Sequence, residues 1–228
     1  MKKQRYDYSN LSWQTRNEPQ YSHLKLIWGW VIYFLLYFLT ENLIPVEKCH
    51  PVHIWLDDLI PFNEYFAIFY CGWFLLVVGS LLYYLLYDVE SFRKLQTFLI
   101  VTQLVAMACY IIYPTRQDLR PEHFDRNNIF TFVMGFIYAF DTSTGVCPSL
   151  HAAYSIGILS VGLKNRKLKP LWKVLLVFVV VMICLATAFV KQHSMVDVFA
   201  ALPVSLVAEL FVYWDDYWKP RLCARKRA

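Results

Sequence analysis

Charged residues are scarce in this chain. Asp, Glu, Lys and Arg make up only 17% of its 228 residues, whereas 58% are hydrophobic and 18% are aromatic. A soluble domain of this length carries about 25% charged residues and spaces its apolar residues in amphipathic patterns. Here the apolar residues come in blocks, several of which reach the roughly 20 residues that cross a bilayer. The composition therefore excludes a soluble domain and predicts an integral helical membrane protein.

Metal-ligand spacings are also absent. The six cysteines are scattered, no CxxC or Cys/His spacing suggests zinc, and the acidic residues form no cluster. We therefore expect no metal and no other cofactor. The net charge of +5 is divided among short loops, which is typical of membrane topology and not of nucleic-acid binding. No cleavable signal peptide is evident, since the first apolar block is long enough to stay as a span.

The apolar blocks predict six spans. One further block, 129–140, is about half the length of a span and is predicted to be interfacial or re-entrant. The Pro-punctuated segment 45–64 reads as a loop with a short interfacial helix. The predicted fold is an all-α integral membrane protein, a six-transmembrane-helix bundle with interfacial segments on the outer face. Its spans are residues 26–44, 65–87, 95–113, 148–163, 171–190 and 196–214.

Positive charge predicts the orientation. With six spans, the tails 1–25 and 215–228 lie on the same side as the turns 88–94 and 164–173, and this side carries most of the 22 Lys and Arg residues. The positive-inside rule makes both tails cytoplasmic and the region 26–214 the membrane domain. We expect a plasma or cytoplasmic membrane location, with the remaining polar loops together on the outer face.

Two of the outer segments carry a histidine close to another candidate site residue. His193 and Asp197 are four residues apart and share a helix face, so the carboxylate can accept a proton from one imidazole nitrogen and leave the other as a nucleophile or base. Ser149 and His151 follow Pro148, which suits the first turn of a helix, where backbone N–H groups bind anions. The alternatives are a buried His satisfied by an acid, and a Ser that merely caps a helix. Ionisable residues near the membrane interior favour function for His193 and Asp197.

The outer segments also carry cations. Arg116 and Arg120 lie four residues apart, and Lys191 precedes His193 by two. Arginine binds phosphate oxygens in bidentate fashion, although a solvated loop that binds lipid headgroups nonspecifically is the alternative. Histidines and cations without a metal fit phosphoryl transfer through a phosphohistidine.

The motifs Arg120-Pro121, Pro148-Ser149-x-His151 and His193-x-x-x-Asp197 occur in this order. Together they resemble the type 2 phosphatidic acid phosphatase superfamily of membrane lipid phosphatases and phosphotransferases, which has a six-helix core. The resemblance implies that His193 attacks phosphorus, that Asp197 orients it and that His151 protonates the departing lipid oxygen. It also implies that Arg120 and Ser149 hold the phosphate.

The chain departs from the family pattern at four positions. Tyr113 stands where the family usually has Lys, Ala186 and Thr187 where it has Ser-Arg, and Leu150 where it often has Gly. Arg116 and Lys191 are candidates to replace the missing cations. Pro-Ser-Leu-His followed by Lys-Gln-His is also similar to the branch of the inositol phosphorylceramide and sphingomyelin synthases.

The leading hypothesis is a metal-independent lipid phosphate phosphatase at the outer leaflet, with a phosphatidic acid-type or polyprenyl (pyro)phosphate substrate. A phospho-headgroup transferase to a lipid alcohol and a non-catalytic lipid-phosphate binder or transporter stay open as alternatives. The expected partners are the lipid phosphate substrate and membrane lipids, without nucleic acid. The sequence leaves the oligomeric state open.

Overall fold

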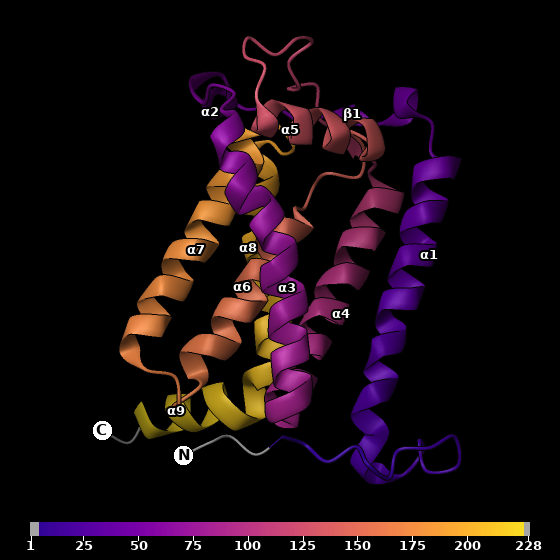
Figure 1. The fold of residues 1–228 in the computed structure, drawn as a ribbon, viewed down its shortest axis with the longest axis vertical. Coiled ribbons are helices and arrows are strands. Elements are labelled where there is room, and N and C mark those ends of the chain that lie inside the picture. The colour runs from indigo at the N-terminus through magenta and orange to yellow at the C-terminus, as the bar shows by residue number, and fades with distance from the viewer. Residues whose placement is uncertain (1–4, 226–228) are drawn as a thin grey trace.

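Long helices form a bundle that a short helix crosses at one end (Figure 1). The computed structural model describes residues 5–225. The helices along the bundle are α1 (Trp28–Leu43), α3 (Ala67–Tyr87), α4 (Val89–Ile112), α6 (Leu150–Lys164), α7 (Pro170–Phe189) and α8 (Met195–Tyr213). The shorter elements are η1 (Pro19–Ile27), η2 (Val46–Lys48), β1 (His50–Pro51), α2 (Trp55–Leu59), η3 (Glu64–Phe66), β2 (Thr115–Arg116), α5 (Ile129–Phe140), η4 (Trp214–Trp218) and α9 (Lys219–Arg225).

Five helical stretches are long and apolar enough to cross a membrane. They are Pro19–Leu43, Glu64–Tyr87, Val89–Ile112, Pro170–Phe189 and Met195–Cys223. This confirms the prediction of a helical protein with membrane-spanning helices. The described chain is helical apart from loops and the two-residue strands β1 and β2, which pair in parallel with His50 opposite Thr115.

The predicted fourth span, α6, has only 15 residues and is not among those five stretches. A rise of 1.5 Å per residue gives it a length of about 22 Å. It packs against α3, α4, α7 and α8, so most of its surface meets protein. Gly157 permits this close packing, because a Cβ there would lie 2.6 Å from Phe98.

Helix extends further than predicted at the bundle's lower end. The predicted charged turn 88–94 is reduced to Asp88, whose carboxylate caps α4 by accepting the N–H of Ser91. Helical structure also extends into both predicted tails, because η1 begins at Pro19 and α9 continues to Arg225. Four of the charges that predicted the orientation lie outside the described residues: Lys2, Lys3, Lys226 and Arg227. The first and last described residues lie at the same end of the bundle, opposite α5 (Figure 1).

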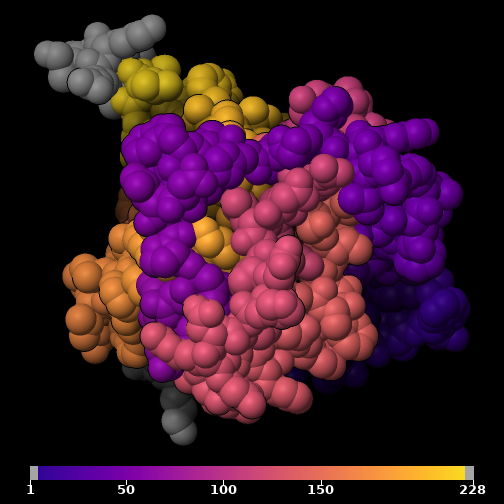
Figure 2. Space-filling view, turned by 90° about the horizontal axis from the view of Figure 1, so that it is seen from above, coloured from indigo at the N-terminus to yellow at the C-terminus, as the bar shows by residue number. Residues whose placement is uncertain are grey.

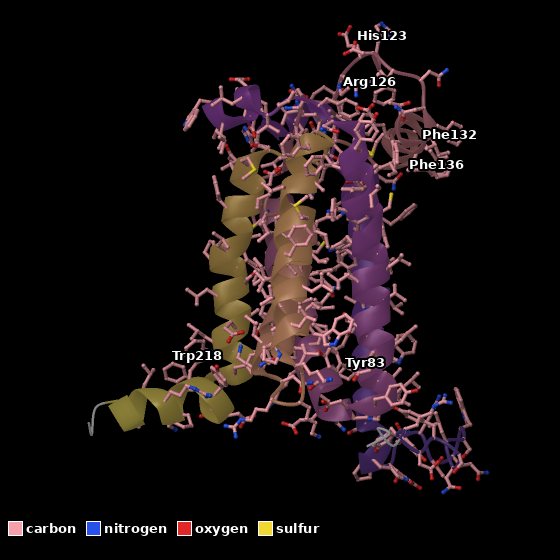
Figure 3. The ribbon with its side chains drawn as sticks, turned by 60° about the vertical axis from the view of Figure 1, so that its left-hand side comes forward. Tyr83, His123, Arg126, Phe132, Phe136 and Trp218 are labelled. Atoms are coloured by element: carbon pink, nitrogen blue, oxygen red, sulfur yellow. The ribbon has the colours of Figure 1, made fainter. Side chains whose placement is uncertain are left out.

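Segments 45–66 and 114–145 cover the other end of the bundle (Figure 2). Helix α5 lies across this end, which agrees with its length of 12 residues. Asn128 caps it by accepting the N–H groups of Phe130 and Thr131. Four large apolar side chains on α5 are exposed, two of which are seen in Figure 3: Ile129, Phe132, Phe136 and Phe140.

Helix α1 stands at the edge of the bundle. None of its residues is buried, and among the bundle helices it packs mainly on α4. One hydrogen bond between them runs from the Trp30 indole N–H to Gln96, 3.1 Å away. This loose attachment leaves a cavity bounded by α1 and α3.

Candidate functional site

The end of α7 forms the turn that presents His193. Val190 is the C-cap of α7, and Lys191 follows in the left-handed conformation with φ of 52°. The N–H of Lys191 donates to Ala188, and that of Gln192 donates to Thr187, the pattern of a Schellman cap. The N–H of His193 also donates to the Thr187 carbonyl, at 3.1 Å. This turn is the non-helical approach that brings His193 to the start of α8.

Asp197 fixes the orientation of His193. Its Oδ2 lies 3.2 Å from His193 Nδ1 and also accepts the N–H of Ser194, which caps α8 in return. Asp197 is completely buried, whereas His193 keeps 8% of its surface exposed. The carboxylate only accepts hydrogen bonds, so Nδ1 of His193 carries the proton and Nε2 presents a lone pair. The predicted pairing of these residues is present in the structure.

His151 completes a line of three side chains. Its Nδ1 lies 3.3 Å from His193 Nε2 and donates to that lone pair. Its ring packs on Trp73, with centroids 4.2 Å apart, and on Tyr70. Its Nε2 is buried and has no hydrogen-bond partner. The order Asp197–His193–His151 can therefore carry charge and a proton along one path.

Ser149 has a structural role in this arrangement. It is fully buried, and its hydroxyl caps α6 by accepting the N–H of Ala152. Its own N–H donates to the backbone carbonyl of Asp197 at 3.0 Å, which joins the start of α6 to that of α8. The sequence allowed Ser149 either to bind an anion or to cap a helix, and the geometry is that of the helix cap.

Arg120 holds a loop in place next to the residue that precedes His193. Its guanidinium donates to the backbone carbonyls of Tyr138, Asp141 and Thr142 and to the side-chain oxygen of Gln192. It therefore ties the end of α5 to the residue just before His193. The same donors are the ones that a phosphate would use.

The other two predicted cations point elsewhere. Arg116 pairs with Asp118 and donates to the carbonyl of Val46. Lys191 donates to the backbone carbonyls of Asp57 and Ile60. Burial lowers the pKa of Lys191, and nearby carboxylates including Asp57 offset part of this effect. The structure thus brings the histidines and Asp197 together and gives Arg116 and Lys191 other partners.

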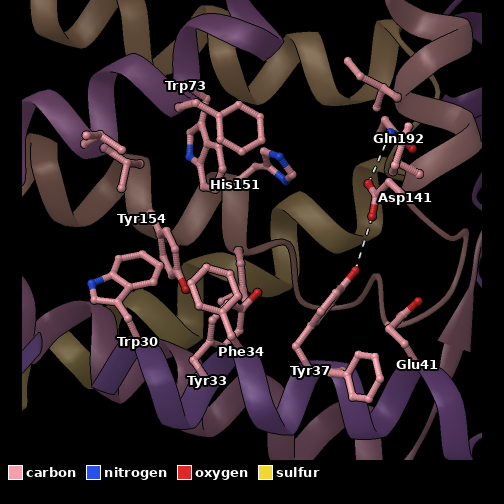
Figure 4. Close-up of a pocket in the computed structure, with 18 of the residues that line it drawn as sticks. Trp30, Tyr33, Phe34, Tyr37, Glu41, Trp73, Asp141, His151, Tyr154 and Gln192 are labelled. Carbon is pink, nitrogen blue, oxygen red and sulfur yellow. Dashed lines mark hydrogen bonds between the residues drawn. The ribbon is translucent and has the colours of Figure 1, made fainter. Parts of the chain in front are cut away.

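A cavity of about 1110 Å³ opens beside the histidines (Figure 4). It extends along α1 and α3 from His193 and His151 at one end to Ile27 and Phe92 at the other. Most of its lining is apolar or aromatic, as a lipid chain requires. Because the rise along α3 is 1.5 Å per residue, the lining from Tyr70 to Leu85 spans about 22 Å.

The polar end of this cavity contains residues that the sequence analysis did not identify. Asp141 accepts hydrogen bonds from Tyr37, at 3.2 Å, and from Gln192, at 3.3 Å (Figure 4). Glu41 accepts the hydroxyl protons of Thr142 and Thr144. The signal for Glu41 was present, because an acidic residue within an apolar block is a functional candidate. Asp141 and Gln192 had no comparable signal.

Asp57 supports the site from α2. It is buried, and its carboxylate accepts the hydroxyl of Ser194 and the N–H of Met195. The negative carboxylate of Asp57 is stabilised by the positive N-terminal end of the α8 dipole. The segment that the sequence marked as a loop with a short helix thus holds the turn before α8.

No three His, Cys, Asp or Glu side chains gather as metal ligands in residues 5–225. Comparisons of the chain with family models, curated proteins and solved structures gave no match.

Proposed function

We propose that this protein cleaves a phosphate ester of a membrane lipid, without a metal ion, through a phosphohistidine on His193. The observation that carries the proposal is the line Asp197–His193–His151 at the head of a lipid-sized cavity. The motif resemblance to the type 2 phosphatidic acid phosphatases supports the same reading. On this proposal α6 also crosses the membrane and brings the number of spans to six, both termini are cytoplasmic and α5 lies in the outer interface.

The first step is attack by His193 Nε2 on phosphorus. A bond forms between Nε2 and phosphorus, and the bond from phosphorus to the lipid oxygen breaks. Asp197 stabilises the positive imidazole ring of His193 by accepting the proton on His193 Nδ1 in a hydrogen bond. The departing oxygen takes a proton from His151 in its imidazolium form. Because His151 lies against Nε2 in the structure, the phosphate must insert between the two rings.

The second step releases the phosphate. Water gives a proton to His151, its oxygen bonds to phosphorus, and the bond to His193 breaks. If an alcohol takes the place of water, the same step is a transfer, as in the synthase-like alternative. Both outcomes use the same residues.

A non-catalytic lipid-phosphate binder is the second candidate. It is favoured by one observation: Arg116, Arg120, Ser149 and Lys191 are all absent from the cavity lining and hydrogen-bonded elsewhere. The oriented His193 ring opposes it, since a binder has no need of a fixed tautomer.

Turnover of lipid phosphates by the purified protein, with EDTA present, separates these candidates. We expect His193→Ala to lower turnover at least 1,000-fold, because the nucleophile is lost, and to abolish an acid-labile phosphoryl adduct seen by intact mass. His123→Ala is the matched control, since His123 is exposed on the loop before α5 (Figure 3). Full activity in His193→Ala would refute the mechanism, and lipid binding without turnover in the wild type would establish the binder.

A further inference from the structure

The cavity beside the histidines has two different ends. Its polar end holds His193, and its inner end is lined by Ile27 and Phe92. Figure 4 places the rings of Trp30 and Tyr154 together, apart from the carboxylates of the polar end. Farther along α3 the lining is aliphatic, with Val77, Val78, Leu81, Leu82 and Leu85. The cavity is therefore suited to a hydrocarbon chain whose polar head lies at the histidines.

Helix α1 closes the inner end of the cavity through its contacts with α4. The Trp30 indole N–H donates to the side-chain oxygen of Gln96 at 3.1 Å, and the Gln96 amide donates to the Leu26 carbonyl at 3.2 Å. Gly29 permits this approach, because a Cβ there would lie 2.6 Å from Ile100. Gln96 lines the cavity and is 1% exposed. A hydrocarbon chain that displaced this buried amide would leave its hydrogen bonds unmade, which is unfavourable.

The segment before α1 covers the same end from outside. Phe92 is buried, and its ring packs edge-on against that of His23, with centroids 5.9 Å apart. The Tyr8 hydroxyl lies 2.8 Å from His23 Nε2 and donates to the carbonyl of Leu85 at 2.8 Å. Phe92 and Leu85 both line the cavity, so folded chain closes its inner end.

The long side of the cavity, between α1 and α3, is open to the surroundings. Five of the side chains that line it there are more than half exposed: Phe34, Phe38, Phe74, Val78 and Leu82. A chain from the bilayer can enter through this side, whereas the closed inner end fixes how far the chain extends.

The depth of the cavity sets a chain length. An extended chain advances roughly 1.2 Å per bond, because three backbone bonds span at most about 3.6 Å. The depth of about 22 Å along α3 therefore accommodates about 18 bonds below the phosphorus. Roughly five bonds lead from phosphorus through glycerol to the first acyl carbon, which leaves a chain of about 14 carbons.

Fit, and not apolar character alone, decides which chain is preferred. A lipid chain already lies in hydrocarbon before it enters, so apolar walls by themselves stabilise it little. A chain that is too short leaves a void whose lining loses its contacts, and a chain that is too long meets the closed end.

We propose that this cavity selects a substrate chain of about 14 carbons, with the phosphate at His193 and the chain end at Phe92 and Gln96. This inference rests on the proposed function and narrows it. The substrate class is a lipid phosphate with ordinary acyl chains, in place of the much longer polyprenyl (pyro)phosphates that the sequence left open.

A competition between chain lengths tests the proposal. Dioctanoyl, dimyristoyl, distearoyl and dierucoyl phosphatidic acids and undecaprenyl phosphate are given together in mixed micelles with EDTA, and the product ratios measured by mass spectrometry yield relative kcat/KM. We expect the dimyristoyl lipid to exceed the dierucoyl lipid and undecaprenyl phosphate at least fivefold.

Variants along the cavity should move this preference. Val78→Trp places a large ring about 12 Å beyond Tyr70 along α3, so the dioctanoyl lipid should become the preferred substrate. Leu75→Trp is the matched control, since Leu75 lies on the same helix, is 78% exposed and is outside this cavity. Phe92→Ala, if its unfolding temperature shows that it folds, should raise kcat/KM for the distearoyl lipid relative to the dimyristoyl lipid.

Two results would overturn the length limit while the proposed function stands. One is equal kcat/KM for the dimyristoyl, dierucoyl and undecaprenyl substrates, and the other is an unchanged preference in Val78→Trp. If wild-type protein turned over none of these lipids, native mass spectrometry with the same set would decide. Preferred binding of the dimyristoyl lipid, shifted to the dioctanoyl lipid by Val78→Trp, would support the limit, and equal binding or none would overturn it.

Discussion

At the scale of the residue, the site depends on how each polar atom is occupied. Asp197 uses Oδ2 for His193 and for the cap of α8, so one carboxylate both builds the helix end and selects the imidazole tautomer. Arg120 gives its N–H groups to three carbonyls and Gln192. An arginine such as Arg120 could bind phosphate, but here its hydrogen bonds within the fold make it a residue that positions the loop beside His193.

Asp141 predicts a pH dependence. Burial raises the pKa of this carboxyl, and the charges of Arg120 and His193 offset only part of that rise. The ionised carboxylate accepts the hydrogen bonds of Tyr37 and Gln192 beside the nucleophile, so kcat/KM for a lipid phosphate should fall on acidification, beginning above the ordinary range of a carboxyl group. Profiles of kcat/KM against pH should show this loss in the wild type and not in Asp141→Asn.

The same raised pKa has the opposite effect on stability. The folded protein binds this proton more tightly than the unfolded chain, so protonation of Asp141 stabilises the fold as pH falls through its raised pKa. Tyr37 and Gln192 donate hydrogen bonds to this carboxyl group, and the charge of Glu41 also acts on it. A loss of kcat/KM that coincides with unfolding would contradict the prediction.

At the scale of the element, the cap of α7 decides where the nucleophile lies. A left-handed conformation costs an L-residue roughly 1–2 kcal/mol, and Gly usually occupies this position. Here Lys191 occupies it, and its ammonium reaches the carbonyls of Asp57 and Ile60. The long side chain thus joins the turn to α2, which a glycine could not do.

Two substitutions separate these effects. Lys191→Gly and Lys191→Ala both lose the two hydrogen bonds, but only Ala keeps the strained backbone. We expect both variants to be less stable than the wild type, and Gly to be more stable than Ala by about 1 kcal/mol in detergent unfolding. If KM rose equally in both variants and stability did not change, Lys191 would instead be a phosphate ligand and not a residue that positions the turn.

At the scale of the whole molecule, hydropathy predicted most of the architecture. The blocks of apolar residues predicted six spans, and five helical stretches are long and apolar enough to be spans. The shorter block 129–140 forms the 12-residue helix α5. The spacing of His193 and Asp197 predicted their pairing on one helix face. They do pair, but His193 lies in the turn before the N-cap Ser194 and not on α8 itself.

The remaining features depend on contacts between distant segments. Lys191 binds carbonyls more than 130 residues away, and Asp141 is hydrogen-bonded to Tyr37 across 104 residues. No periodicity in the chain encodes such pairs. Sequence patterns therefore identified the histidines but not Glu41 and Asp141, the carboxylates that line the same cavity.

The orientation can be tested with native cysteines. Cys223 is exposed on α9, at the end that the positive-inside rule makes cytoplasmic. A membrane-impermeant maleimide should label it only after the cells are permeabilised, and Cys223→Ser should lose the signal. Burial, together with the charge of Asp197, raises the pKa of Cys147 to about 12, so this thiol should stay unlabelled at neutral pH.

A cysteine placed on the opposite side provides the complementary control. His123→Cys, on the exposed loop before α5, should react in intact cells. Labelling of Cys223 in intact cells would show that the orientation is the opposite of the one predicted.

The loose attachment of α1 has an evolutionary consequence. This helix buries none of its own residues, yet it supplies Tyr37 and Glu41 to the cavity, while the histidines belong to the densely packed α6 and the cap of α8. Side chains that are only partly buried against the core, as those of α1 are, can change at a smaller cost in stability than fully buried ones. We therefore expect substrate preference in homologous chains to diversify through α1, while the reacting groups stay the same.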